Sequence, residues 1–304
     1  PSYVWQVDAS NYWTVTSATT TDALGASPRV VAKIDGAWTS AESNSVYIED
    51  WDTDVDNYIK VYTTNLARHD GKWSTTKYRL ESNAARSLSV NEANVVVDGL
   101  QLFNNVAGET YPAVLSTGVD SGGYGLVISN NIIRADYSGL TGAGYGVGLS
   151  SATFLSGKRY IYNNIFYNIF DSGLGGIAIY LRSYDNYVHN NTIYNSNLGI
   201  NQTSVGTVFA INNIVASTTI PFQGTFQASS THNATDDAIE TPSGASGTTI
   251  NSATFNFVST ASGTEDFHLQ ETSTDVLDAG YNLSSDPYLR VTEDIDGMTK
   301  QFNS

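Results

Sequence analysis

The sequence predicts an all-β protein folded as a parallel β-helix, a solenoid of stacked coils with an asparagine ladder and terminal caps. Three observations predict this fold. An Asn-Asn pair recurs inside strand-like segments, successive copies lie 22 to 33 residues apart, and the runs between them lack helical periodicity. A repeat of this length made of short strands indicates a β-solenoid rather than a helical or leucine-rich array.

The repeat aligns into columns. Its copies read VISNNIIR, YIYNNIFY, YVHNNTIYN and FAINNIVA, at residues 127–134, 160–167, 187–195 and 209–216. The first asparagines of the pairs form one column, and the second asparagines form the next. A further copy, VDGLQL, places Gly99 in the first column and Leu100 in the second.

The exchange of Gly for Asn in the first column indicates a particular backbone geometry. Gly and Asn are the residues that most readily adopt a left-handed conformation. We therefore expect the first column to mark a tight bend with positive φ. The second asparagine then points inward, where stacked amides hydrogen-bond along a ladder and satisfy one another.

Three regions are expected along the chain. Residues 1–30 form an N-terminal cap or a segment that pairs with another subunit, because a bare solenoid end exposes strand edges. Residues 31–264 form the parallel β-helix, with a Ser/Thr/Gly-rich loop excursion at 220–264. Residues 265–304 are acidic and are expected to cap the C-terminal end.

Composition restricts the partners and the compartment. The chain has 304 residues, a net charge of −16 and no cysteine. The charge opposes binding to nucleic acid or anionic lipid, and the lack of cysteine excludes disulfides and Cys-based zinc sites. Polysaccharide, cations or further copies of the chain are the expected partners. No transmembrane segment is expected, and the chain begins at Pro1, so we predict a secreted or cell-surface protein that has lost a signal peptide.

Two stretches carry a resemblance to a known family. Residues 50–82, DWDTDVDNYIKVYTTNLARHDGKWSTTKYRLES, followed by Gly99-Leu100-Gln101, resemble secreted bacterial proteins with right-handed, single-stranded parallel β-helix repeats of the pectate-lyase-like superfamily fold. DFHLQETSTDVLDAG at 266–280, with DIDG at 294–297, resembles the terminus of extracellular anchored β-helix proteins. The resemblance implies the fold and secretion, but it leaves the function open because this fold hosts many roles.

Candidates for catalysis follow from the chemistry that such relatives perform. Enzymes of this fold cleave polysaccharides with a basic residue, often aided by Ca²⁺, or with paired carboxylates. The candidates here are Arg134, Arg182, Asp136 and Asp171. No spacing places the two aspartates opposite each other, and an aspartate after a strand more commonly caps a turn.

Tyrosines supply candidates for carbohydrate binding. Tyr167 and Tyr194 follow Arg134 in one column on successive coils, and this column is expected to be exposed. Tyr180 and Tyr184 form a second aromatic patch beside Arg182. Such rows either stack on sugars or pack against each other across neighbouring strands.

Two weaker patterns concern metal and modification. The segment EDWDTDVDN carries alternating acids at Asp50, Asp52 and Asp54 and resembles a calcium loop, although Val55 stands where the turn glycine belongs. Ca²⁺ is thus the one cofactor that the sequence suggests. Asn-x-Ser/Thr acceptors for glycosylation occur at Asn190, Asn201, Asn233 and Asn282.

Three functions are compatible with these patterns. The first is an extracellular structural or cell-surface protein that assembles end to end into filaments or a matrix, because solenoid ends must be capped or paired. The second is a polysaccharide lyase or glycoside hydrolase acting in a groove on the β-helix. The third is a glycan-binding adhesin, which uses an aromatic groove without an acid or a base. The sequence favours the structural protein, because no catalytic constellation is recognisable in it.

Overall fold

The computed structural model describes residues 30–117, 125–149, 157–171, 175–182, 184–203, 206–239, 241–287 and 289–298, together with the backbone of two strands at 3–6 and 12–16. These residues form strands, turns and irregular segments, and none of them is helical. The all-β class predicted from the sequence is therefore confirmed for the described part of the chain.

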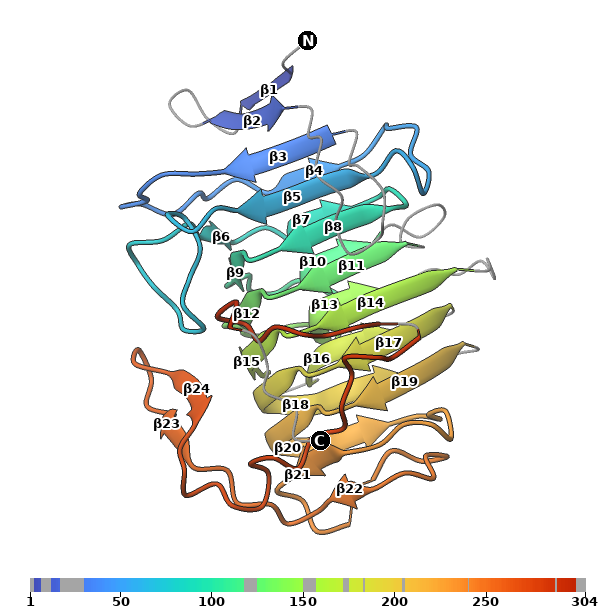
Figure 1. The fold of residues 1–304 in the computed structure, drawn as a ribbon. Helices are drawn as coiled ribbons and strands as arrows, with labels where there is room; N and C mark the ends of the chain where they lie inside the picture. Colours follow the sequence, from blue (N-terminus) through green and yellow to red (C-terminus); the bar gives the residue numbers. More distant parts are fainter. Residues whose placement is uncertain are drawn as a thin grey trace.

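One sheet of nine strands forms one wall of the molecule (Figure 1). All neighbours from β3 onward are parallel, whereas β1 and β2 form an antiparallel hairpin that pairs with β3. In spatial order the strands are β1 (Tyr3–Gln6), β2 (Tyr12–Thr16), β3 (Val30–Ile34), β5 (Ile59–Thr63), β8 (Val95–Asp98), β11 (Leu126–Ser129), β14 (Lys158–Tyr162), β17 (Asp185–His189) and β19 (Thr207–Ile211).

The second sheet has thirteen strands and is curled into a half-barrel. Its bend lies in β18, whose first part pairs with β15 and whose second part pairs with β16. The strands are β4 (Val46–Ile48), β6 (Leu80–Ser82), β7 (Arg86–Val90), β9 (Gln101–Asn104), β10 (Ala113–Thr117), β12 (Ile132–Ala135), β13 (Gly144–Leu149), β15 (Ile165–Ile169), β16 (Gly176–Leu181), β18 (Thr192–Gln202), β20 (Ile214–Gln223), β21 (Asn233–Thr235) and β22 (Thr249–Ile250).

The chain passes repeatedly through the same three positions. It runs through β8, β9 and β10, then through β11, β12 and β13, and then through β14, β15 and β16. Each strand pairs in parallel with its equivalent in the next pass, so that Ile128 is in register with Val97 and Ile161. Equivalent positions of successive passes therefore stack in columns along the molecule.

Alternate side chains of these strands fill the interior. Val97, Ile128, Ile161 and Val188 are fully buried and belong to one continuous apolar cluster. Complete burial of a side chain of this size contributes about 1.5–3 kcal/mol. The four residues are also β-branched, which suits the pleated surface of a strand. The column thus stabilises each pass against the next.

The predicted bend is confirmed in the first asparagine column. The φ angle is 56° at Asn130, 55° at Asn163, 55° at Asn190 and 59° at Asn212. Gly99 takes the same position on an earlier pass with a φ of 77°. Each bend turns the chain from the nine-stranded sheet into the curled sheet.

The second asparagine column forms hydrogen bonds from pass to pass. Nδ2 of Asn164 donates to Oδ1 of Asn191 at 3.0 Å and to the carbonyl of Ile128 at 2.9 Å. Equivalent pairs of bonds are made by Asn131, Asn191 and Asn213. All these amides are buried, so each bond replaces one that water would otherwise make.

A further rung of the ladder lies in the region that the sequence predicts as a loop excursion. Nδ2 of Asn213 donates to Oδ1 of Asn233 at 2.8 Å, and His232 occupies the bend with a φ of 53°. The strands β21 and β22 then continue the curled sheet in parallel. Within 220–264, residues 233–235 and 249–250 therefore belong to the body of the solenoid.

Residues 254–298, here called the C-terminal strap, run back along the outside of both sheets (Figure 1). The strap begins with an antiparallel pair, β23 (Phe257–Ser259) and β24 (Asp266–Leu269). Phe257 and Phe267 pack on the outer face of the curled sheet, and Leu283 and Val291 pack on the nine-stranded sheet. The sequence predicts an end cap in this region, whereas the described strap covers the sides of the sheets.

Candidate functional site

Three tyrosines form a row on the outside of the curled sheet. The rings of Tyr111 and Tyr145 are stacked with centroids 6.3 Å apart and planes inclined by 11°. The rings of Tyr145 and Tyr180 are stacked at 4.7 Å and 26°. The three residues lie on successive passes of the chain, just before β10, in β13 and in β16. We call them the tyrosine row.

Glycines allow these rings to lie against the sheet. A Cβ atom at Gly142 would come within 2.8 Å of the Tyr111 ring, and one at Gly148 would come within 3.2 Å of the Tyr145 ring. Gly148 is in register with Tyr180 on the neighbouring strand. The pattern GYGVGL of β13 therefore provides both an aromatic ring and the flat surface beside it.

The row is accessible and uncharged. Tyr111 is 56% exposed, and Tyr145 and Tyr180 are partly exposed. Burial among its neighbours, together with the nearby phenols of Tyr180 and Tyr111, raises the pKa of Tyr145 to about 12, so this hydroxyl stays protonated at neutral pH. The Thr203 hydroxyl donates to the Tyr180 oxygen at 3.1 Å and extends the polar edge of the row.

Arg182 is the charged neighbour of the tyrosine row. It follows β16 directly, and its positive charge favours ionisation of the Tyr145 phenol. Among the described residues its guanidinium makes no hydrogen bond or ion pair. Arg182 was predicted as a catalytic candidate, and the structure places it beside an aromatic surface.

The predicted carbohydrate-binding tyrosines lie in different environments. Tyr180 belongs to the tyrosine row. Tyr167 is only 1% exposed, because Phe267 of the strap lies 5.2 Å from its ring, and Tyr194 contacts the same Phe267. Tyr184 is buried under Arg159. The exposed column expected at Tyr167 and Tyr194 is thus covered by a distant part of the chain.

The remaining catalytic candidates are not assembled into one site. The Arg134 guanidinium lies between two rings, 4.1 Å from the centroid of Trp73 and 4.5 Å from that of Phe103. Asp136 is exposed, whereas Asp171 is only 3% exposed and its carboxylate does not lie on the surface. The structure therefore does not present these residues as a pair of carboxylates with a base.

The acidic segment around Asp50 forms a turn. Oδ1 of Asp54 accepts the backbone N–H groups of Asp56 and Asn57, both at 2.8 Å, while Asp50 and Asp52 are exposed. Within the described ranges, no three His, Cys, Asp or Glu side chains are grouped so that they could hold a metal ion. The predicted Ca²⁺ site at Asp50, Asp52 and Asp54 has no support in this geometry.

The predicted glycosylation acceptors also differ in accessibility. Asn282 is exposed. Asn201 is 2% exposed and donates to Gln223, and Asn233 is fully buried in the ladder. A glycan on Asn233 would have to replace the hydrogen bonds of its amide nitrogen. Asn190 is partly exposed and lines the cavity described next.

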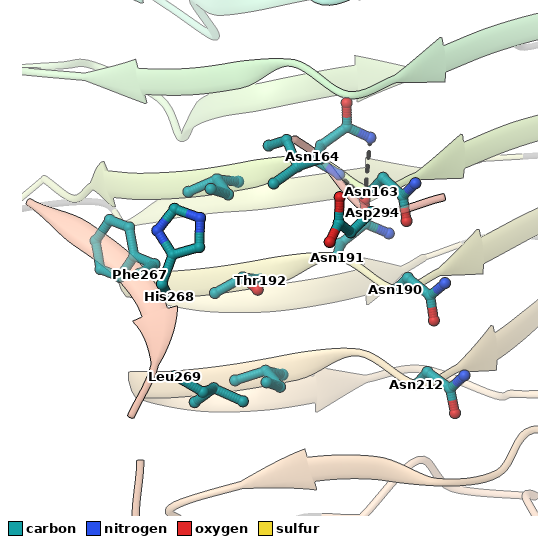
Figure 2. Close-up of a pocket in the computed structure, with 13 residues that line it drawn as sticks. Asn163, Asn164, Asn190, Asn191, Thr192, Asn212, Phe267, His268, Leu269 and Asp294 are labelled. Carbon is teal, nitrogen blue, oxygen red and sulfur yellow. Dashed lines mark hydrogen bonds between the residues drawn. The ribbon is translucent and has the colours of Figure 1, made fainter. Parts of the chain in front are cut away.

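A cavity of about 340 Å³ lies between the strap and the bends of the curled sheet (Figure 2). One side is formed by the starts of β15, β18 and β20, and the other by β24 and the turn at 294–295. His268 of β24 stands in its wall. The lining residues are Asn163, Asn164, Ile165, Asn190, Asn191, Thr192, Asn212, Ile214, Phe267, His268, Leu269, Asp294 and Ile295.

His268 links two parts of the strap. Its Nε2 lies 2.8 Å from Oδ2 of Asp296, and its Nδ1 lies 2.5 Å from Oδ1 of Asp266. Burial opposes protonation, but the hydrogen bonds and negative charges of Asp266 and Asp296 outweigh it and raise the pKa of His268. Lys72 reaches the other oxygen of Asp266 at 3.4 Å. This cluster holds β24 against the turn that closes the cavity.

No family model, curated protein or solved structure matches this chain. Among the described residues, no helix has the length and apolar character needed to cross a membrane. The tyrosine row and the cavity are therefore the two features of the molecule from which its function is inferred.

Proposed function

We propose that this chain is an extracellular, right-handed parallel β-helix that binds glycans along the tyrosine row. The observation that carries the proposal is the exposed stack of Tyr111, Tyr145 and Tyr180 on successive passes. A pyranose ring has an apolar face and a rim of hydroxyls. The stacked rings turn their faces toward one another, so the row offers their apolar edges to the first and their hydroxyls to the second.

Charge and spacing support a glycan over other extended ligands. The net charge of −16 opposes nucleic acids and anionic membranes. The row is built from parallel strands, whose spacing repeats at about 4.8 Å. A linear oligosaccharide can therefore contact several rings at once, which increases its affinity without requiring a deep pocket.

The proposed role is binding without catalysis. Arg134 is held between Trp73 and Phe103, and Asp171 is buried, so these two candidates are not free to reach a sugar. Arg182 borders the tyrosine row and is assigned to ligand selection. This role corresponds to an adhesin or another cell-surface scaffold.

A second proposal concerns assembly of the chain with itself. The hairpin of β1 and β2 extends the nine-stranded sheet, and β1 has a neighbour on one side only within the described residues. An unpaired edge is a template for another strand. Deletion of residues 1–13 should then abolish end-to-end chains in electron micrographs, and unchanged chains would contradict this proposal.

The glycan proposal is tested by binding measurements on an oligosaccharide array, followed by calorimetry. We expect the Tyr111→Ala and Tyr180→Ala variants each to weaken binding about tenfold, which corresponds to roughly 1.4 kcal/mol. Tyr47→Ala is the matched control, because Tyr47 is 46% exposed on β4 of the same sheet. Equal losses in the control, or no bound glycan on the array, would refute the proposal.

A further inference from the structure

The cavity under the C-terminal strap contains polar groups that the fold itself does not use. Three asparagines of the bend column, Asn163, Asn190 and Asn212, line it on successive passes. Nδ2 of Asn163 donates to the carbonyl of Glu293 at 2.7 Å, and Nδ2 of Asn212 donates to the carbonyl of Tyr281 at 2.8 Å. The two outer asparagines are therefore occupied in holding the strap.

The middle asparagine, Asn190, differs from the other two. Among the residues that the structure describes, the Asn190 side chain makes no hydrogen bond, and Figure 2 shows it between Asn163 and Asn212. Its amide therefore offers both a donor and an acceptor to a molecule in the cavity.

Two residues after Asn190, the floor of the cavity contains a second polar side chain from the middle pass, Thr192. Thr192 is in register with Ile165 on one side and with Ile214 on the other. A hydroxyl thus takes a position where both neighbouring passes carry isoleucine. No described residue hydrogen-bonds to this hydroxyl, so Asn190 and Thr192 present free polar groups from the middle pass.

The rest of the lining restricts the class of ligand. Phe267, Leu269 and Ile295 supply apolar walls. The only cationic candidate in the lining, His268, already contacts two carboxylates. Oδ1 of Asp294 accepts hydrogen bonds from the backbone N–H groups of Asp296 and Met298. The negative charge of this carboxylate opposes the binding of anions in the cavity. A small uncharged molecule with one apolar face and several hydroxyls fits these conditions.

We infer that this cavity binds a single neutral sugar ring, held by the amide of Asn190 and the hydroxyl of Thr192 against the apolar wall of the strap. Its volume of about 340 Å³ lies at the lower end of the range for small-molecule sites. The site is separate from the tyrosine row in residues and in chemistry, because it has room for one ring between the strap and the sheet, whereas the row offers an open surface to a chain.

The experiment uses the full chain and free D-glucose, D-galactose and D-mannose, with ligand-observed NMR and calorimetry. We expect saturable binding of at least one monosaccharide. Thr192→Val, which keeps the shape of the side chain, and Asn190→Gly, which keeps the positive φ, should each weaken that binding about tenfold. Tyr47→Ala, at an exposed position outside both proposed sites, is the control and should leave it unchanged.

Three outcomes would overturn the inference. One is that none of the monosaccharides binds at about 50 mM, and another is that binding survives both cavity variants. The third is that methylamine binds and the sugars do not, which would indicate a cation site at Asp294. Loss of oligosaccharide binding in Tyr111→Ala alone would concern the tyrosine row and not this cavity. Circular dichroism and thermal unfolding of each variant separate loss of binding from loss of fold.

Discussion

Nδ2 of Asn164 donates a 3.0 Å hydrogen bond to Oδ1 of Asn191, which lies 27 residues later and one pass further along the molecule. The same Oδ1 atom accepts the backbone N–H of Asn164, also at 3.0 Å. One amide oxygen therefore satisfies two buried donors. This relationship makes the ladder a structural element in its own right.

Replacement of Asn191 by leucine should destabilise the fold strongly. Leucine is similar in size, but it removes the acceptor of the Asn164 N–H and the side-chain donor to the carbonyl of Ile161. The Asn164 side-chain amide loses one acceptor and keeps the carbonyl of Ile128. An unsatisfied buried group costs about 1–3 kcal/mol, so we expect a loss of about 2–4 kcal/mol. Urea unfolding measures it. Asn65→Leu, at an exposed position, is the control, and an equally small loss in both variants would contradict the prediction.

Substitutions of Asn190 test how much the backbone conformation of the bend contributes to stability, independently of the hydrogen bonds of the ladder. Asn190 has a φ of 55° and makes no side-chain hydrogen bond with the described residues. Asn190→Gly should therefore change stability little, whereas Asn190→Val should cost about 1–3 kcal/mol, because a β-branched residue is strained at positive φ. Thermal unfolding compares the two variants. Similar melting temperatures would show that the bend does not require this conformation.

Two buried histidines predict loss of stability in acid. Burial lowers the pKa of His69 and of His189 to about 4, below the value of about 6.5 expected when the chain is unfolded. The unfolded state then binds more protons between these values, so the free energy of unfolding falls as the pH drops from 6.5 toward 4. The effect is roughly 3 kcal/mol per histidine.

His189→Phe should reduce this dependence on pH. Phenylalanine keeps a ring next to Tyr187, whose centroid lies 6.1 Å from that of His189, but it does not titrate. Urea unfolding at pH 7 and pH 4.5 gives the difference for both proteins. If the variant loses as much stability as the parent on acidification, the assignment to His189 fails.

The strap is expected to show the opposite dependence of stability on pH, because of His268. Its pKa is raised by Asp266 and Asp296, so its stabilising contribution is complete below about pH 6.5 and is lost as the pH rises through the folded value. We expect hydrogen exchange at residues 266–296, corrected for intrinsic rates, to accelerate above that value. His268→Gln should show no such step, and a step that persists in the variant would exclude His268 as its cause.

Arg182 is expected to select among glycans at the tyrosine row. A guanidinium beside the rings favours ligands that carry carboxylates, because paired charges of opposite sign attract. Arg182→Gln should therefore weaken binding of uronate-containing oligosaccharides several-fold and leave neutral ones within twofold. A parallel loss for both classes would assign Arg182 to the shape of the surface instead.

The ladder could be predicted because its signal is local. Each bend needs a residue that tolerates positive φ, and each inward amide needs another amide on the next pass. The first asparagine of the pair meets the first requirement and the second asparagine meets the second, so both are visible in adjacent positions. Asn233 escaped prediction because His232, rather than asparagine, precedes it at the bend. The number of rungs was thus harder to predict than their existence.

The surface could not be predicted in the same way. Tyr167 and Tyr194 are in register and share one column, as their alignment indicates, but Phe257 and Phe267, between 63 and 100 residues later in the chain, pack on them. The sequence of a strand does not indicate whether a distant segment will pack on its outer side. Tyr111 and Tyr145 were missed because loops of unequal length separate them from the asparagine pairs, so their register could not be counted.

The strap also changes how the molecule should come apart. A stack of coils that touch only their neighbours can fray pass by pass from an end, because each interface is nearly independent. Here Asn163 binds the carbonyl of Glu293, 130 residues away, and Lys72 reaches Asp266, 194 residues away. The last passes cannot detach while the returning chain is fastened to the earlier ones. Unfolding should therefore begin with release of the strap, and pulling on the C-terminus should peel it off before any coil opens.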